Sequence, residues 1–113
     1  MLKQYVIVPK KPKMSKGKIA SQVAHATFMA LEKENSKLIK TWKETGMCVI
    51  ILECKNTEQL LSAEKYFNQW RIINHLYIDE GYTEVDPLTP TALATGIIEE
   101  HTQWMLGQFK LYK

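Results

Sequence analysis

The 113-residue sequence lacks the features that mark membrane, secreted and disulfide-bonded proteins. No apolar run approaches the roughly 20 residues that a membrane-spanning helix needs. The N-terminus also lacks the layout of a signal peptide, so we expect a cytoplasmic protein with no membrane partner. Its only two cysteines, Cys48 and Cys54, bracket one apolar run. A strand would hold them about 20 Å apart, beyond disulfide reach, so we expect both to be reduced.

Motifs for several common chemistries are missing as well. The sequence contains neither G-x-G-x-x-G nor G-x-x-x-x-G-K-[ST], and it has no G-x-S-x-G nucleophile elbow. His25, His75 and His101 lie in different predicted elements and have no metal-ligand spacing. These absences argue against a nucleotide-binding loop, a serine hydrolase and a zinc hydrolase, and we predict no metal site.

Acidic residues are absent before Glu32, although the net charge of the whole chain is only +3. Six lysines lie in that first part: Lys3, Lys10, Lys11, Lys13, Lys16 and Lys18. The remainder carries nine basic and twelve acidic residues. This asymmetry favours a polyanionic partner for the N-terminal part, and a solubilising surface is the alternative.

The hydrophobic pattern predicts alternating strands and helices in one domain spanning residues 1–113. Strands are expected at 2–8, 47–54, 72–78 and 91–97, helices at 16–34, 36–45, 56–70 and 98–106, and an extended tail at 109–112. This order predicts a layered α/β fold. The second strand is apolar without interruption, which is typical of a strand covered on both faces.

The stretch from Met14 to Ala26 combines cationic residues with the start of a helix. Ser15 is suited to be the N-cap, and Lys16 and Lys18 follow where a helix is partly positive and offers free N–H groups. Lys18, Gln22 and His25 fall on one stripe of this helix. The stretch could therefore bind an anion such as phosphate, although a solvated turn is the simpler alternative.

A second candidate region begins where the third predicted strand ends. Asp79 stands at that end, and a turn-rich loop from Gly81 to Pro90 follows it. Loops at strand ends often gather at one edge of an α/β sheet, so Asp79 and Lys18 could meet there. Threonine hydroxyls at Thr83, Thr89 and Thr91 could donate to a developing oxyanion. Turn capping is the alternative for Asp79 and for these threonines.

Four blocks, in this order and spacing, resemble the type II peptidyl-tRNA hydrolase family over nearly the whole chain. They are KMSKGKIA at 13–20 with Gln22, Ala24, His25 and Ala26; DEGYTE at 79–84; PLTPT at 87–91 with Leu93 and Gly96; and GQFKLY at 107–112. The resemblance implies a three-layer α/β/α fold with a mixed four-stranded sheet. It also implies a cytoplasmic homodimer that needs no metal or organic cofactor.

The activity implied by the resemblance is hydrolysis of the ester that joins a peptide to the 3′ ribose of tRNA, so the expected partner is peptidyl-tRNA. The family's catalytic positions fall on Lys18, Asp79, Thr83 and Thr91. Lys18 is expected to stabilise the oxyanion or to protonate the leaving hydroxyl, and Asp79 to orient Lys18 or the attacking water. The expected tRNA-binding residues are Lys10, Lys11, Lys13, Lys16, Gln22 and His25.

The sequence departs from the family pattern at a few positions around these blocks. Pro9 and Lys11 stand where the family usually has Arg and Asp, and Glu80 adds a carboxylate beside Asp79. Leu88 replaces a turn glycine, and Ile97 replaces a proline. These departures keep two alternatives open.

The first alternative is a catalytically inactive tRNA- or RNA-binding member of the same fold. The second is a protein-interaction module that uses exposed residues among Trp42, Trp70 and Trp104.

Overall fold

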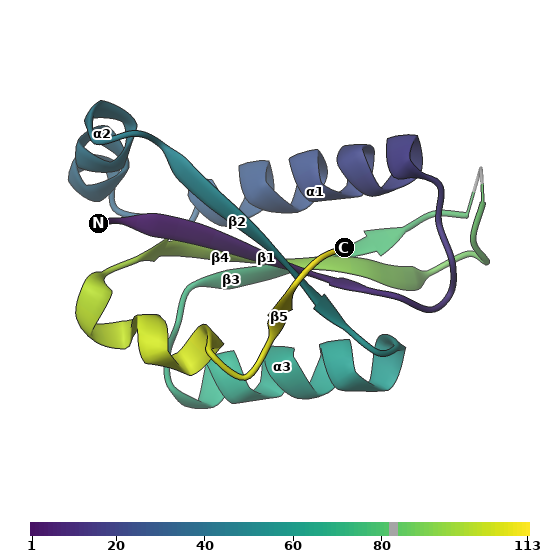
Figure 1. Cartoon of the computed structure of the whole chain (residues 1–113). Coiled ribbons are helices and arrows are strands. Elements are labelled where there is room, and N and C mark those ends of the chain that lie inside the picture. The colour runs from purple at the N-terminus through teal and green to yellow at the C-terminus, as the bar shows by residue number, and fades with distance from the viewer. Residues whose placement is uncertain (82–83) are drawn as a thin grey trace.

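The computed structural model describes residues 1–81 and 84–113, which form one twisted sheet with helices packed against it (Figure 1). The strands are β1 Lys3–Pro9, β2 Cys48–Cys54, β3 Asn74–Asp79, β4 Thr89–Ile98 and β5 Lys110–Leu111. The helices are α1 Lys16–Leu31, α2 Ser36–Glu44, α3 Thr57–Gln69 and the 3-10 helix η1 Glu100–Leu106. Strand order across the sheet is β3-β4-β1-β2-β5.

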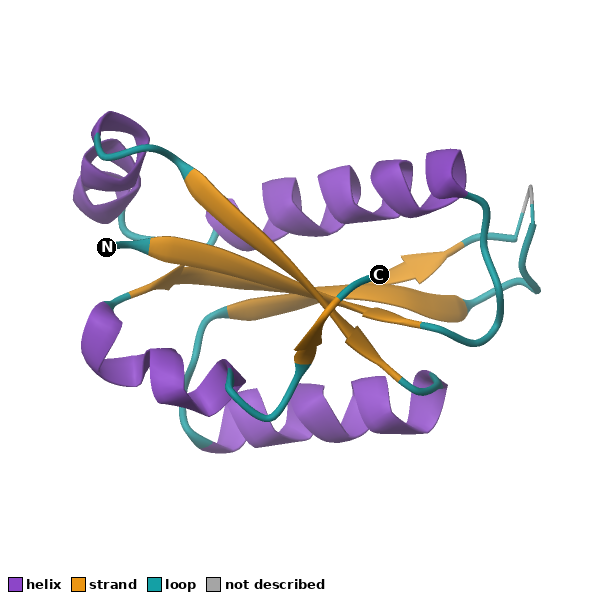
Figure 2. Ribbon diagram, viewed as in Figure 1, coloured by secondary structure: helices purple, strands orange, loops and turns teal. Residues whose placement is uncertain are grey.

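Helices lie on both sides of the sheet, as the predicted three-layer arrangement requires (Figure 2), and an apolar cluster fills each side. Successive side chains of a strand point to opposite faces. On β1, Val6 and Val8 therefore pack with Ala26 of α1, whereas Tyr5 and Ile7 belong to the cluster on the other face. That second cluster includes Leu60 and Phe67 of α3 and Met105 of η1. Small alanines on α1 allow this helix to lie close to the strands.

Strand direction brings the candidate residues to one end of the sheet. β2 is parallel to β1, and β4 is antiparallel to both β1 and β3. The carboxyl ends of β1, β2 and β3 therefore lie together with the beginning of β4, on the right in Figure 1. We call this end the carboxyl edge. Open α/β sheets bind ligands outside the carboxyl ends of their strands.

The sheet has five strands rather than the four that the resemblance implies. The additional strand, β5, lies within the predicted extended tail and pairs antiparallel with Leu52 and Glu53 of β2. Two residues are too short for a hydrophobic period to identify, so only pairing with β2 makes this segment a strand. Both cysteines, Cys48 and Cys54, are free, as predicted.

Most element boundaries differ from the sequence-based prediction by one to three residues, and the end of α1 differs most. α1 ends at Leu31, because Asn35 caps the next helix and accepts hydrogen bonds from the N–H groups of Lys37 and Leu38. The last predicted helix is a 3-10 helix. No helix in the part of the chain that the structure describes is long and apolar enough to cross a membrane.

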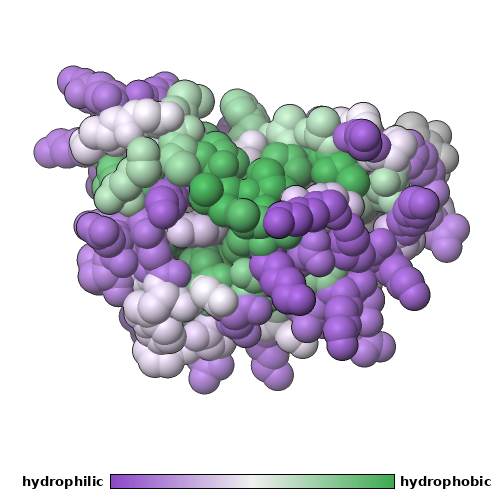
Figure 3. All heavy atoms as spheres, viewed as in Figure 1, coloured by the Kyte–Doolittle hydropathy of each residue, from purple (hydrophilic) through white to green (hydrophobic). Residues whose placement is uncertain are grey.

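The prediction that the second strand is covered on both faces is wrong for its first half. Val49 is 39% exposed, and Met47 just before the strand is also exposed. β5 pairs only with the far end of β2, and α1 packs mainly over β4 and β3. Apolar surface is consequently visible across the middle of the face in Figure 3, where Figure 1 places β2.

Candidate active site

The first turn of α1 begins at the carboxyl edge with the predicted cap. Ser15 has extended backbone angles, φ −67° and ψ 162°, and its Oγ accepts a hydrogen bond from the backbone N of Lys18 at 3.2 Å. The N-cap prediction is therefore confirmed. This bond fixes the orientation of the turn from which the Lys18 side chain projects.

Lys18 and Asp79 meet, as their predicted positions suggested. Lys18 Nζ donates to Asp79 Oδ1 at 2.7 Å, and the two side chains are only 8% and 9% exposed. The other carboxylate oxygen, Oδ2, accepts the backbone N–H of Gly81 at 2.7 Å. Both oxygens of Asp79 therefore hold a donor, and the carboxylate is fixed from two sides.

The pKa of Asp79 is lowered, chiefly by the hydrogen bond from Lys18. Burial acts in the opposite direction, while the Gly81 N–H and the positive charge of Lys18 lower the pKa further. Asp79 is thus a stable carboxylate at neutral pH. The site presents a fixed ammonium–carboxylate pair next to the start of a helix.

Gly81 and Pro87, two residues that follow Asp79, are packed closely against each other. Gly81 has φ +83°, and a Cβ at this position would lie 2.5 Å from the backbone of Pro87. Leu88 N donates to the carbonyl oxygen of Asp79 at 2.8 Å, which closes the loop onto the end of β3. Leu88 has φ +64°, a conformation that suits glycine, and its side chain is 74% exposed.

Glu84 connects this loop to the cap of α1. One of its carboxylate oxygens accepts from Ser15 N at 2.6 Å, and the other accepts from the Ser15 hydroxyl. These bonds lower the pKa of Glu84. Sequence reasoning assigned no role to Glu84, because a contact across 69 positions has no local signal.

Thr91 reaches α1 through a β-bulge. Tyr77 pairs with Ala92 and Ile78 pairs with Pro90, which leaves Thr91 as an extra residue in β4. Pro90 has no N–H to donate to β3. The bulge that forms there changes the direction of the next side chain, that of Thr91. Thr91 is fully buried, and its hydroxyl donates to Gln22 Oε1. Gln22 is itself buried at 2% exposure and donates to Ser21 Oγ.

His25 stacks on Tyr77 one turn further along α1. The ring centroids are 4.7 Å apart and the planes differ by 14°. His25 is exposed and Tyr77 is half-buried. Sequence reasoning missed Tyr77, although it lies two residues before Asp79 in β3 and so faces the same side.

Four predicted RNA-contacting lysines are exposed around the carboxyl edge. Lys11, Lys13 and Lys16 belong to the connection into α1 and to its first residue. Lys10 is held more firmly, because its Nζ donates to the carbonyl of Lys113 at 2.6 Å and lies 4.4 Å from the centre of the Tyr112 ring. The prediction for Thr83 falls outside the described residues.

The remaining departures and alternatives have simple structural settings. Glu80, the extra carboxylate beside Asp79, is exposed. Lys18 forms its ion pair with Asp79 and not with Glu80. Ile97 N donates to Glu34 Oε2 at 2.8 Å, a bond that a proline could not make. Trp42 is buried, and Trp70 and Trp104 form an exposed edge-to-face pair.

Within residues 1–81 and 84–113, no three His, Cys, Asp or Glu side chains gather as possible metal ligands.

Similarity to known proteins agrees with the geometry. The chain is 36% identical to a peptidyl-tRNA hydrolase of Methanopyrus kandleri over 85% of this chain and 84% of that protein. It is 34% identical to a peptidyl-tRNA hydrolase of Thermoplasma volcanium over 98% of both chains. A solved structure of a protein of unknown function from Agrobacterium tumefaciens strain C58 shares the fold, with a TM-score of 0.62, 13% identity, and coverage of 99% of this chain and 98% of that one.

The family described as peptidyl-tRNA hydrolase PTH2 matches residues 2–112. This match includes the cap of α1, the Lys18–Asp79 pair and the bulged threonine. The chain therefore belongs to the PTH2 family of peptidyl-tRNA hydrolases.

Proposed function

We propose that this chain hydrolyses the ester bond between a peptide and the 3′ ribose of tRNA. Water adds to the ester carbonyl, a tetrahedral oxyanion forms, and collapse breaks the bond to the ribose oxygen. One proton of the water ends on the ribose oxygen, and the other is released when the new carboxyl group ionises. The products are a peptide with a free carboxylate, a tRNA with a free 3′ hydroxyl and a proton. The observation that carries the proposal is the Lys18–Asp79 pair, held at the carboxyl edge of a family member.

Lys18 is the proposed electrophilic group. An ammonium has three N–H donors, and the bond to Asp79 uses one of them. The others remain for the oxyanion or for the leaving ribose oxygen. Because the pair is almost fully buried, a charge developing beside Lys18 interacts with it more strongly than it would in water.

Asp79 is proposed to orient Lys18 rather than to activate the water. A lowered pKa makes a carboxylate a weak base, and both of its oxygens already accept hydrogen bonds. These two features support a positioning role. The Gly81 N–H bond contributes by fixing the plane of the carboxylate.

The threonines have different proposed roles. For Thr91, complete burial and the hydrogen bond to Gln22 favour a supporting role beneath the first turns of α1. The same burial favours a supporting role for Gln22 over direct contact with RNA. Thr83 is proposed to donate a hydrogen bond to the substrate, as the family resemblance implies.

The exposed lysines are proposed to meet tRNA phosphates near the reacting end. They are Lys10, Lys11, Lys13 and Lys16, and His25 is an exposed candidate further along α1. Contacts of this kind release counterions, so tRNA affinity should fall steeply as salt rises.

We further propose that residues 1–113 act as one catalytic domain, in the cytoplasm where translation produces peptidyl-tRNA. We also propose a homodimer that forms through the exposed apolar edge of β2. Met47 and Val49 are exposed there, and burial of such a strip against a second copy would stabilise the pair.

Release of a labelled N-blocked amino acid from N-blocked aminoacyl-tRNA tests the proposed activity. The wild-type protein should catalyse release, and Lys18→Ala should lower the rate about 100-fold or more while the protein stays folded. Folded wild-type protein that binds tRNA at low salt without releasing product would identify an inactive binding member instead.

A further inference from the structure

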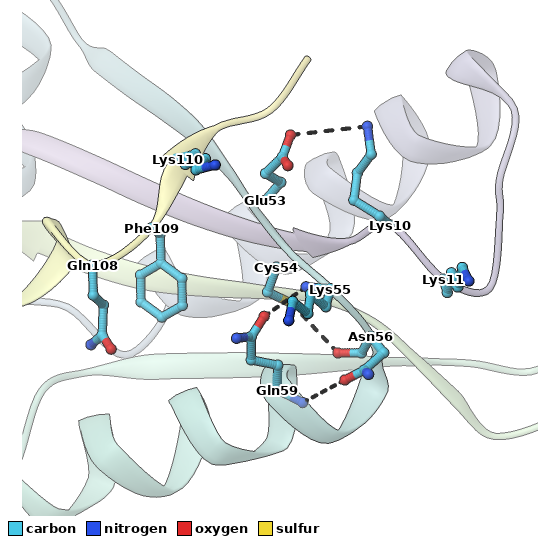
Figure 4. A pocket seen from close by; sticks show the side chains of 10 residues that line it. All are labelled: Lys10, Lys11, Glu53, Cys54, Lys55, Asn56, Gln59, Gln108, Phe109 and Lys110. Carbon is cyan, nitrogen blue, oxygen red and sulfur yellow. Dashed lines mark hydrogen bonds and ion pairs between the residues drawn. The ribbon is translucent and has the colours of Figure 1, made fainter.

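A second basic feature lies at the carboxyl edge, on the side of β2. A cavity of about 690 Å³ opens there, and Lys18 and Asp79 do not line it (Figure 4). We call it the basic cavity, and its lining includes Lys10, Lys11, Lys55, Lys110, Glu53 and Phe109. It therefore needs an explanation apart from the catalytic pair.

The charges in the basic cavity are strongly unequal. Four lysines line it and only one acidic residue, Glu53. Glu53 lies 3.9 Å from Lys10, whose Nζ also donates to the carbonyl of Lys113. Among the described residues, Lys11, Lys55 and Lys110 have no ion-pair partner. Like charges brought together without compensation favour an anionic ligand.

The fold, rather than one flexible segment, gathers these lysines. Lys10 follows β1 and Lys55 follows β2, and the two strand ends are tied by the hydrogen bond from Lys10 N to the carbonyl of Cys54 at 2.8 Å. Lys110 reaches the cavity from β5 on the other side. The ends of two parallel strands are a common location for phosphate-bearing ligands.

An aromatic wall accompanies the cations. Phe109 is half-buried and lines the basic cavity. It packs against the core cluster that lies between the sheet and α3. Lysines beside an aromatic ring suit a nucleotide, whose phosphate meets the charges while a base or ribose lies against the ring. Inorganic phosphate would use only the charged half of such a surface.

We propose that the basic cavity binds a phosphate-bearing segment of the tRNA, upstream of the 3′-terminal nucleotide that reaches Lys18. This inference rests on the proposed function. β2 lies three strand positions from β3 in the sheet, or about 14 Å at about 4.8 Å per step. A span of that size exceeds one nucleotide. The exposed Lys13, on the connection from β1 into α1, and the exposed Lys16, the first residue of α1, could meet the intervening phosphates.

Affinity for deacylated tRNA, measured by fluorescence anisotropy over a range of salt concentrations, tests the inference. The variant is Lys55→Glu with Lys110→Glu, and the matched control is Lys37→Glu with Lys40→Glu on the exposed face of α2, at the other end of the sheet (Figure 1). The cavity variant should bind roughly tenfold more weakly than the control, and its salt slope should be smaller by about 2. Equal affinities and slopes in the two variants would overturn the inference.

Turnover separates this inference from the proposed function. The ratio of kcat/KM for N-blocked aminoacyl-tRNA to that for N-blocked aminoacyl-nucleoside should fall about tenfold in the cavity variant relative to the control. If wild-type protein releases product from neither substrate, the proposed function fails. If wild-type protein is active and this ratio is the same in both variants, only the cavity inference fails.

Amide chemical shifts of the wild-type protein avoid dependence on the folding of a variant. Titration with an RNA oligonucleotide that has a tRNA 3′ end should shift the signals of Lys55, Asn56 and Lys110. Shifts with inorganic phosphate but not with the RNA would assign the basic cavity to a small anion and would refute the RNA segment.

Discussion

At the residue scale, Lys18 and Asp79 depend on each other for both stability and chemistry. Asp79→Asn would leave Lys18 as a nearly buried charge without its carboxylate. We expect a loss of about 3 kcal/mol in the free energy of unfolding and a fall in turnover of about 100-fold. Urea unfolding and ester-release rates measure the two effects.

A double variant separates the two effects. Lys18→Met with Asp79→Leu replaces both charges by apolar side chains of similar size, so we expect most of the lost stability to return. Turnover should stay absent, because no ammonium is left for the oxyanion. A double variant as unstable as Asp79→Asn would contradict this account of the pair.

The lowered pKa of Asp79 also predicts how stability changes with pH. A carboxyl group whose pKa is depressed by folding stabilises the native state above its unfolded pKa, near 3.8. That contribution is lost as the pH falls through the lower, native pKa. The stability difference between wild type and Asp79→Asn should therefore be constant from pH 7 to about pH 5 and should shrink in stronger acid. A stability difference that grew as the pH fell would show that folding raises the pKa of Asp79, and would contradict this account.

Leu88 is strained in the loop that closes on Asp79. A left-handed conformation costs a non-glycine residue about 1–2 kcal/mol, whereas glycine pays about 0.5–1 kcal/mol in entropy. Because the Leu88 side chain is exposed, its removal costs little packing energy. We expect Leu88→Gly to raise the free energy of unfolding by about 0.5–1 kcal/mol, seen as a rise in Tm of a few degrees, about 4 °C. Leu88→Ala, which keeps its Cβ, should gain less.

At the element scale, the start of α1 joins the two halves of the site. Ser15 caps the turn that carries Lys18 and binds Glu84 of the opposing loop. Ser15→Ala should therefore cost about 1 kcal/mol of stability and lower turnover roughly tenfold through misplacement of Lys18.

Asn35→Ala is the matched control for this cap, because Asn35 caps α2 in the same way. It should lose similar stability without the turnover loss. Equal turnover of folded Ser15→Ala and Asn35→Ala would show that the cap of α1 does not contribute to catalysis.

At the scale of the whole molecule, the uncovered half of β2 predicts association. Val49 is exposed on an edge that β5 pairs with only at Leu52 and Glu53. Charges on edge strands prevent pairing between copies, so Val49→Lys should convert a dimer into a monomer with an intact fold. Sedimentation of wild type and variant measures the change, with Lys40→Glu as a surface control. A monomeric wild type, or a variant that still dimerises, would refute this interface.

The sequence by itself determined the layered α/β fold, the cap at Ser15 and the proximity of Lys18 to Asp79. These features follow from hydrophobic period, capping chemistry and the convergence of strand ends, which are either local or set by strand order. The four motif blocks added the family, because their order and spacing are specific.

Only the tertiary structure decided the features that depend on distant partners. Thr91 faces Gln22 because a bulge forms where Pro90 meets β3, and Glu84 meets Ser15 across 69 positions. β5 exists as a strand only because β2 supplies its hydrogen bonds. No period or propensity over a few residues encodes such contacts. Pairing, bulges and uncovered edges arise when the whole sheet assembles, and with them the basic cavity.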